Sequence, residues 1–207
     1  MLEKDYIDEL FDNRPVEMGV KLRPNLLQHP NIPPPLHGLA PRVLKGQEWW
    51  DKVRQDAYAS TNYHCLACGI HKTEAKYHQW LEAHEDYSID YEKGVMEIKE
   101  IIPLCHSCHN FIHCGRLIMV NGKTKKGVLK ILEIMNHGMT ILRDNNLPMH
   151  FHAAMMCDHL GVNYECDVMP EEKTKVASWN KWHLILDGDK YYSKFKNDEE
   201  WRKFYNN

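Results

Sequence analysis

Apolar residues recur with the period of a helix in two stretches of the chain, 46–60 and 124–142. In the second stretch they form one continuous stripe: Val128, Ile131, Leu132, Met135, Met139 and Leu142. The pattern stops at Asn145, Asn146 and Pro148, which are residues that commonly end helices. We therefore predict a helix over 46–60 and a long amphipathic helix over 124–142.

Between these two stretches the apolar runs are shorter and richer in aromatic and β-branched residues. The pattern appears around Tyr63 and again over 80–89 and 95–104. Such runs are typical of short strands or hairpins. We expect a small unit that depends on metal ions for part of its stability, because most of the cysteines lie in this region.

The C-terminal part of the chain carries clear turn and cap residues. The segment 149–176 predicts a short helix that ends near Gly161, followed by a loop. Further on, Asp187 and Gly188 separate two apolar runs, and this dipeptide accepts the positive φ angles of a tight hairpin turn. Asn197 precedes three acidic residues and predicts the start of a last helix.

Proline is concentrated at the start of the chain, where seven of the ten prolines lie within the first 41 residues. This density disfavours both a helix and a central strand. We therefore predict an extended arm over 1–41, a metal-stapled domain over 42–120 and a C-terminal α+β region over 121–207. The fold class expected for the whole chain is α+β.

Charge and hydropathy exclude several classes of protein. The 26 basic and 29 acidic residues give a net charge of -3, which excludes a protein that coats polyanions over its whole surface. The chain has neither a run of eighteen apolar residues nor an apolar signal-peptide core near its start, so we expect no membrane contact. The predicted location is the cytoplasm.

Cysteine spacing gives the strongest chemical signal in the sequence. The chain has seven cysteines and no export signal, which favours metal binding or free thiols over a disulfide framework. Two CxxC pairs, Cys65 with Cys68 and Cys105 with Cys108, are separated by 36 residues. Each pair can present two thiolates to one tetrahedral ion, so we predict a structural zinc site.

Histidines and charged residues surround the second pair. His109 and His113 are four residues apart and are expected on one face of a short helix. The segment 82–100 has a net charge of -5, which favours a divalent cation. The segment 116–130 has five basic residues and no acidic ones, which favours contact with a phosphate backbone. These five basic residues are Arg116, Lys123, Lys125, Lys126 and Lys130.

Three blocks of this sequence, in this order, resemble a known family. CLACG at 65–69, LEAHE at 81–85 and PLCHSCHNFIH at 103–113 are similar to the HNH endonuclease motif in its tetracysteine-zinc form. The resemblance covers roughly residues 60–115, and the lead-in at 35–58 is similar to that of phage and bacterial members. It implies a ββα-metal core, also called a His-Me finger, over the 42–120 domain. It also implies that the cytoplasm is that of a bacterial or phage-infected cell.

The resemblance also implies site residues. In that family a strand histidine acts as the general base on water, while a helix histidine and a neighbouring side chain hold one Mg²⁺ or Mn²⁺ ion. Here His84 falls on the strand, and His113 falls on the metal-binding helix position, with His109 as a further candidate ligand. The zinc of the four cysteines is structural in this family.

The strand motif departs from the family pattern and leaves two interpretations open. If His84 is the base, Ala83 stands at the first metal position, and Glu85 or Asp90 would complete the metal site with His113. If His84 is instead a metal ligand, Glu85 occupies the base position. We favour His84 as the base, because an imidazole has a pKa of about 6.5, whereas a glutamate would need burial to reach that range. Glu100 also replaces the middle asparagine of the motif.

Two hypotheses on function follow. The first is a metal-dependent HNH-type endonuclease that hydrolyses DNA phosphodiester bonds. The second is a catalytically degenerate HNH-like zinc module that binds nucleic acid or a protein partner, for instance as a phage-encoded effector. The second hypothesis gains support from the two departures from the motif, and the first from the combination of His84, Glu85 and His113.

Overall fold

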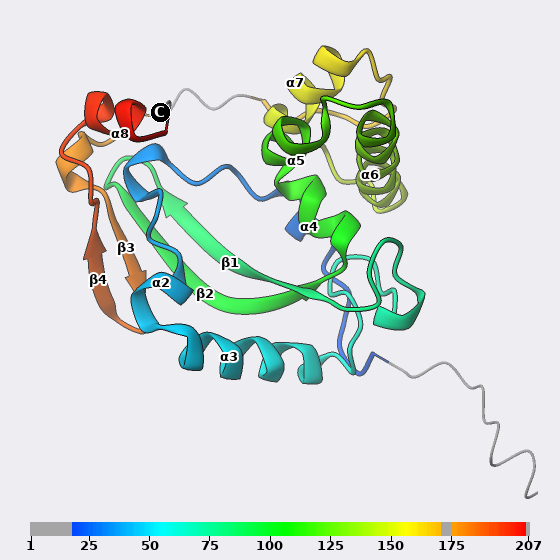
Figure 1. The fold of residues 1–207 in the computed structure, drawn as a ribbon, viewed down its shortest axis with the longest axis horizontal. Helices are drawn as coiled ribbons and strands as arrows, with labels where there is room; N and C mark the ends of the chain where they lie inside the picture. The colour runs from blue at the N-terminus through cyan, green and yellow to red at the C-terminus, as the bar shows by residue number, and fades with distance from the viewer. Residues whose placement is uncertain (1–17, 171–174, 206–207) are drawn as a thin grey trace, which may run out of the picture.

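The computed structural model describes residues 18–170 and 175–205 and has a mixed α+β architecture (Figure 1). Its strands are β1 (Glu82–Asp90), β2 (Val95–Leu104), β3 (His183–Leu186) and β4 (Asp189–Tyr192). Its α-helices are α2 (Pro41–Lys45), α3 (Gln47–Ser60), α4 (His106–Ile112), α5 (Cys114–Asn121), α6 (Lys125–Asp144), α7 (Phe151–Leu160) and α8 (Asp198–Tyr205). Short 3-10 turns are η1 (Pro24–Gln28), η2 (Pro34–Leu36), η3 (Lys72–Glu74) and η4 (Trp179–Lys181).

The four strands form one sheet in the order β1-β2-β3-β4. β1 and β2 are an antiparallel hairpin whose register pairs Glu82 with Leu104 and shifts between Asp86 and Tyr87. β3 then pairs with β2 in parallel, and β4 closes the sheet as an antiparallel edge. The C-terminal region is therefore not a separate unit, because its hairpin extends the sheet of the central domain.

Helices lie on both sides of the long hairpin (Figure 1). Helix α3 lies along one side of it, and α4 to α7 gather on the other side, next to the end where β2 runs into α4. Gly138 of α6 lies so close to α4 that a Cβ atom there would be 2.2 Å from the ring of Phe111. A larger residue at this position would push the two helices apart, so the close α4–α6 contact explains the glycine.

Most elements predicted from the pattern are confirmed. The helices predicted over 46–60 and 124–142 are α3 and α6, and the two central runs are β1 and β2. In the C-terminal hairpin, Asp187 and Gly188 have the positive φ angles of 53° and 83° that the turn requires. The oxygen of Asn197 accepts a hydrogen bond from the amide of Glu200 at 2.9 Å, as expected of an N-cap.

Two expectations differ from the structure. The run around Tyr63 forms only a single bridge, between His64 and His71, because Tyr63 itself takes a left-handed φ of 59° that breaks an extended strand. The described part of the predicted arm, residues 18–41, is packed rather than extended. Its η1 turn buries Leu26 and Leu27 almost completely in the core beside α4 and α6. Residues 1–17 lie outside the described residues.

None of the helices in the described ranges combines the length and apolar character that crossing a membrane would require.

Candidate metal centres and nuclease site

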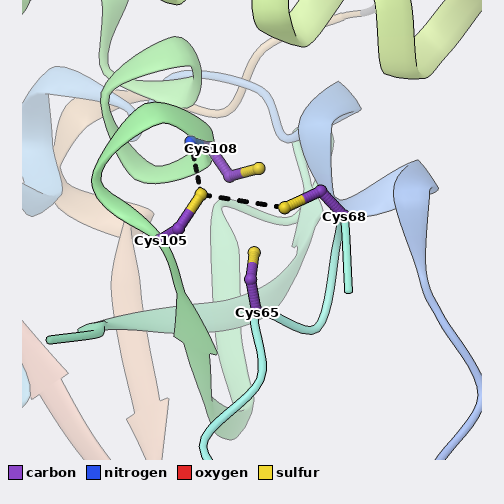
Figure 2. A group of neighbouring side chains, drawn as sticks. All are labelled: Cys65, Cys68, Cys105 and Cys108. Atoms are coloured by element: carbon purple, nitrogen blue, oxygen red, sulfur yellow. Dashed lines mark hydrogen bonds between the residues drawn. The ribbon is translucent and has the colours of Figure 1, made fainter. Parts of the chain in front are cut away.

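Four cysteines from the two predicted pairs converge between the chain segment before β1 and the start of α4 (Figure 2). Their sulfur atoms all lie within 4.8 Å of one another, and the Cys68 and Cys105 sulfurs are 3.8 Å apart. Gly69, with a φ of 79°, closes the first knuckle by donating its amide to the carbonyl of Cys65. Cys105 caps α4 by accepting a hydrogen bond from the amide of Cys108.

The chemistry of this cluster fits a zinc ion. Thiol–thiol hydrogen bonds lower the pKa of Cys105, while the same contacts raise the pKa values of Cys68 and Cys108. Such proton sharing is what four crowded thiols do without a cation, and a soft divalent ion would replace the shared protons. The cluster could therefore hold a metal ion and is compatible with zinc.

In a second cluster, three histidines converge. His84 comes from β1, His109 from the middle of α4, and His113 from the junction of α4 with α5. One ring nitrogen of each lies within 4.8 Å of the other two. The ring centroids are 4.8 to 5.4 Å apart, with the planes steeply inclined. Three imidazoles so arranged can share one divalent ion.

His84 is the most deeply buried member of this trihistidine cluster, with only 1% of its surface exposed. Burial, together with the charges of His109, His113 and His29, holds its pKa well below the usual range, so its ring is neutral. Its Nδ1 atom is buried and has no hydrogen-bond partner among the described residues. A neutral ring with a free buried nitrogen is the state in which histidine binds a metal ion, so His84 fits the role of a ligand.

Glu82 forms hydrogen bonds to His109, one of the three histidines of the cluster, and to the neighbouring His106. One carboxylate oxygen accepts from Nδ1 of His109 at 2.5 Å and the other from Nδ1 of His106 at 2.5 Å. Burial would raise the pKa of Glu82, but these two histidines outweigh it and lower the pKa to about 2. A carboxylate on Nδ1 fixes the imidazole tautomer and leaves Nε2 of His109 free for a metal ion. Glu82 and His106 also form a third group of potential ligands with His78.

Sequence reasoning missed His29, which reaches the cluster from the proline-rich segment. Its Nδ1 lies 3.2 Å from Nε2 of His84, and its Nε2 lies 3.0 Å from a carboxylate oxygen of Asp86. This chain of contacts, Asp86 to His29 to His84, orients the ring of His84 and leaves Nδ1 as its free nitrogen. No spacing rule links positions 29 and 84, so only the three-dimensional structure reveals the contact.

The two departures from the family motif have visible structural roles. Glu100, at the position of the motif asparagine, forms an ion pair with Arg23, which also pairs with Asp86. The Arg23 guanidinium thus ties both strands of the hairpin to the segment that carries His29. At the other departure, Ala83 packs against the main hydrophobic core.

Glu85 and Asp90, the two acidic residues predicted for the site, lie in different places. Burial raises the pKa of the Glu85 carboxyl, and Glu85 lines a cavity that His113 also lines. Asp90 instead closes the β1–β2 turn, where it accepts hydrogen bonds from the amide and the ammonium of Lys93. It lies six positions along the strand from His84, a span of about 20 Å, so it is not a ligand of this cluster.

The five basic residues predicted for phosphate contact occupy α5, α6 and the turn between them. Arg116 is exposed and lies on the rim of the same cavity. Lys123, Lys125 and Lys126 are also exposed. Lys130 is half-buried, with its ammonium 4.9 Å from the centre of the Tyr77 ring. The structure therefore leaves four of the five cations accessible.

Comparison of the chain with protein-family models, with curated proteins and with solved structures gave no match.

Proposed function

We propose that the protein is a metal-dependent HNH-type endonuclease that hydrolyses DNA phosphodiester bonds. The observation that carries this proposal is the convergence of His84, His109 and His113 beside a tetracysteine cluster. The order of elements, an antiparallel hairpin followed by a short helix, is what the ββα-metal fold requires. Both clusters use α4, so the zinc site would hold the helix that presents the catalytic ligands.

The geometry favours His84 as a metal ligand and Glu85 as the base. Three imidazole nitrogens already lie close together, and the free buried Nδ1 of His84 is available as a donor. Glu85 is the next residue along β1 and lines the same cavity as His113, which supports a role for it beside the bound substrate. This reverses the preference drawn from the sequence, in which His84 was the base.

The protein residues then have distinct tasks in hydrolysis. Glu85 accepts the proton of a water molecule whose oxygen forms a new bond to phosphorus, in line with the bond from phosphorus to the 3′ oxygen that breaks. Arg116, beside the cavity, binds an adjacent phosphate. When bound to the trihistidine cluster, a divalent ion supplies charge neutralisation for the phosphate and the leaving oxygen. A set of imidazole ligands suits Mn²⁺ or Ni²⁺ better than Mg²⁺, which prefers oxygen.

Cleavage of supercoiled plasmid DNA tests this proposal directly. The wild-type protein should nick or linearise the plasmid with Mn²⁺ or Ni²⁺ and less readily with Mg²⁺. His84→Ala and His113→Ala should each remove cleavage while zinc content stays unchanged. His159→Ala, an exposed histidine on α7 outside the clusters, is the matched control and should cut normally. A wild-type protein that cuts DNA with none of these ions would overturn the proposal.

The second candidate function is an HNH-like zinc module that binds nucleic acid or a protein without cutting. One observation favours it: Glu100, where the motif has asparagine, is engaged by Arg23 rather than directed to the trihistidine cluster. Under this alternative the tetracysteine cluster maintains the fold, and the exposed cations of α5 and α6 bind phosphates. DNA binding with no cleavage in the plasmid assay would support it.

A further inference from the structure

A large cavity opens beside the trihistidine cluster. It has a volume of about 930 Å³ and lies between the proline-rich segment 30–41, the sheet and α8 on one side and the α4–α5 junction on the other. This volume is at the upper end of the roughly 300–1,000 Å³ that is usual for ligand pockets. Glu85 and His113 belong both to this cavity and to the proposed nuclease site. Whatever enters the cavity therefore lies next to the reacting phosphate.

The walls of the cavity are mainly apolar and contain several flat aromatic side chains. Tyr87 and Tyr91 come from the β1 side, Trp182 precedes β3, and Trp201 and Tyr205 come from α8. The indole Nε1 of Trp201 donates to His37 at 3.1 Å, which holds α8 against the proline-rich segment. Aromatic walls of this kind bind ring systems by stacking, and a nucleobase offers such a face whatever its sequence.

Formal charge in the lining is limited to two described residues, Glu85 and Arg116. Glu85 is half-buried, while Arg116 is exposed on the rim. A cation at the rim and a mainly apolar, aromatic interior match a nucleotide, whose phosphate is anionic and whose base is flat. A paired base in a duplex cannot enter such a cavity without leaving its stack.

We propose that this cavity binds an unpaired nucleobase of the DNA strand whose phosphate lies at the trihistidine cluster. The proposal rests on the nuclease function proposed above and narrows its substrate to DNA with an unpaired nucleotide. The unpaired base has two sources, a single strand or a base extruded from a duplex, and both present the same ring and phosphate. The proline-rich segment, which forms one wall, thereby has a direct part in substrate recognition.

Binding without hydrolysis tests the proposal separately from catalysis. The full-length protein, with no added divalent ion, is titrated into three labelled DNAs of equal length: single-stranded oligodeoxythymidylate, a fully paired duplex, and a duplex with one mismatch. Binding should be tightest for the single strand, intermediate for the mismatch and weakest for the paired duplex. Equal affinity of the single strand and the mismatched duplex would identify extrusion as an efficient source of the base.

Matched variants locate the binding in the cavity. Tyr205→Leu should weaken single-strand binding by about five- to fiftyfold, since loss of one stacking partner has an effect of this order. Tyr192→Leu removes a similarly exposed tyrosine of β4 that does not line the cavity, and it should bind normally. Arg116→Gln should reduce the slope of log affinity against log salt by about one. Circular dichroism and zinc content check that each variant is folded.

A second readout uses the wild-type protein alone. Three of the six tryptophans line the cavity, so bound oligodeoxythymidylate should quench much of the intrinsic fluorescence. Equal affinity for single strand and paired duplex, with neither quenching nor an effect of Tyr205→Leu, would overturn the cavity proposal. If the cavity proposal failed in this way but the protein still cleaved plasmid DNA, the proposed nuclease function would remain supported. Selective binding of unpaired DNA without cleavage would instead support the cavity and reject the nuclease function.

Discussion

The two candidate metal clusters, which both use residues of α4, are built in different ways. The four cysteines come as two short pairs, and each pair takes its shape from a local turn or a helix start. The trihistidine cluster instead needs a strand, a helix and a helix junction to meet, and then His29 from a fourth segment to orient one of its rings. The first cluster is therefore built from two locally shaped knuckles, whereas the second depends on contacts among four separate segments.

This difference determines how each cluster should respond to mutation. Removing a ligand from the tetracysteine cluster should damage the fold, because there the energy of metal binding is energy of folding. Removing a ligand or a supporting group from the trihistidine cluster should damage metal binding or catalysis while the fold survives. Four predictions test this contrast, beginning with the largest effect.

Cys105→Ser should give a protein that does not fold its central unit. Cys105 both contributes to the metal cluster and caps α4, so its loss affects the zinc site and the helix together. About one equivalent of zinc should copurify with the wild type and none with the variant, as measured by metal analysis and circular dichroism. Cys166→Ser, which lies outside the cluster, should keep its zinc. A folded wild-type protein without zinc would contradict this prediction.

Glu85→Gln should lower the cleavage rate by about 10²- to 10⁴-fold without changing the fold. Since Glu85 is proposed as the base, added Mn²⁺ should not restore the rate. Glu92→Gln, in the exposed β1–β2 turn, is the control and should cut normally. If high Mn²⁺ restored the cleavage rate of Glu85→Gln, Glu85 would instead be a metal ligand and His84 would be the base.

His29→Ala should weaken metal binding at the trihistidine cluster by about 10- to 100-fold, the usual effect of losing a group that orients a ligand. Co²⁺ titration followed by visible absorption can measure this, because nitrogen-bound and thiolate-bound cobalt have different spectra. His29→Gln retains a hydrogen-bonding side chain and should lose less affinity than His29→Ala. Unchanged cobalt affinity in His29→Ala would show that His29 only packs against its neighbours.

Neutralising Lys123, Lys125 and Lys126 should have the smallest effect, confined to DNA affinity. For every phosphate that a lysine no longer neutralises, the slope of log affinity against log salt should fall by about 0.9 on duplex DNA. Lys52→Gln, on α3, is the control and should leave the slope unchanged. If DNA binding by the wild-type protein did not depend on salt, the result would favour a protein partner over contact of these lysines with phosphates.

The parts of the fold that could be predicted are those set by local sequence. The strong apolar period of α6, the turn at Asp187 and Gly188 and the two CxxC pairs each depend on residues close in sequence. The packing of the proline-rich segment was not predicted, because proline content excludes regular elements but says nothing of tertiary contacts. Leu26 and Leu27, which anchor that segment, are too short a run to indicate burial.

The residues of the candidate site divide in the same way, into those that local sequence predicts and those that depend on tertiary contacts. His109 and His113 follow from helix spacing, and His84 follows from the family resemblance. The sequence predicts Asp90 at the site because it is close to His84 along the chain. In the structure Asp90 lies at the turn of the β1–β2 hairpin, because the extended strand separates the two residues. His29 could not be found, because its contact with His84 spans 55 residues and depends on the Arg23, Asp86 and Glu100 ion pairs.

The parallel pairing of β2 with β3 has a consequence for the order in which the chain can fold. Val95 pairs with His183, so the sheet cannot be completed until most of the chain has been synthesised. The β1–β2 hairpin and α4 to α6 are complete much earlier, and short-range contacts of this kind form fastest. During translation both metal clusters would therefore assemble before the walls contributed by β3 and α8. A nascent chain would bring its two clusters together first and complete its aromatic cavity last.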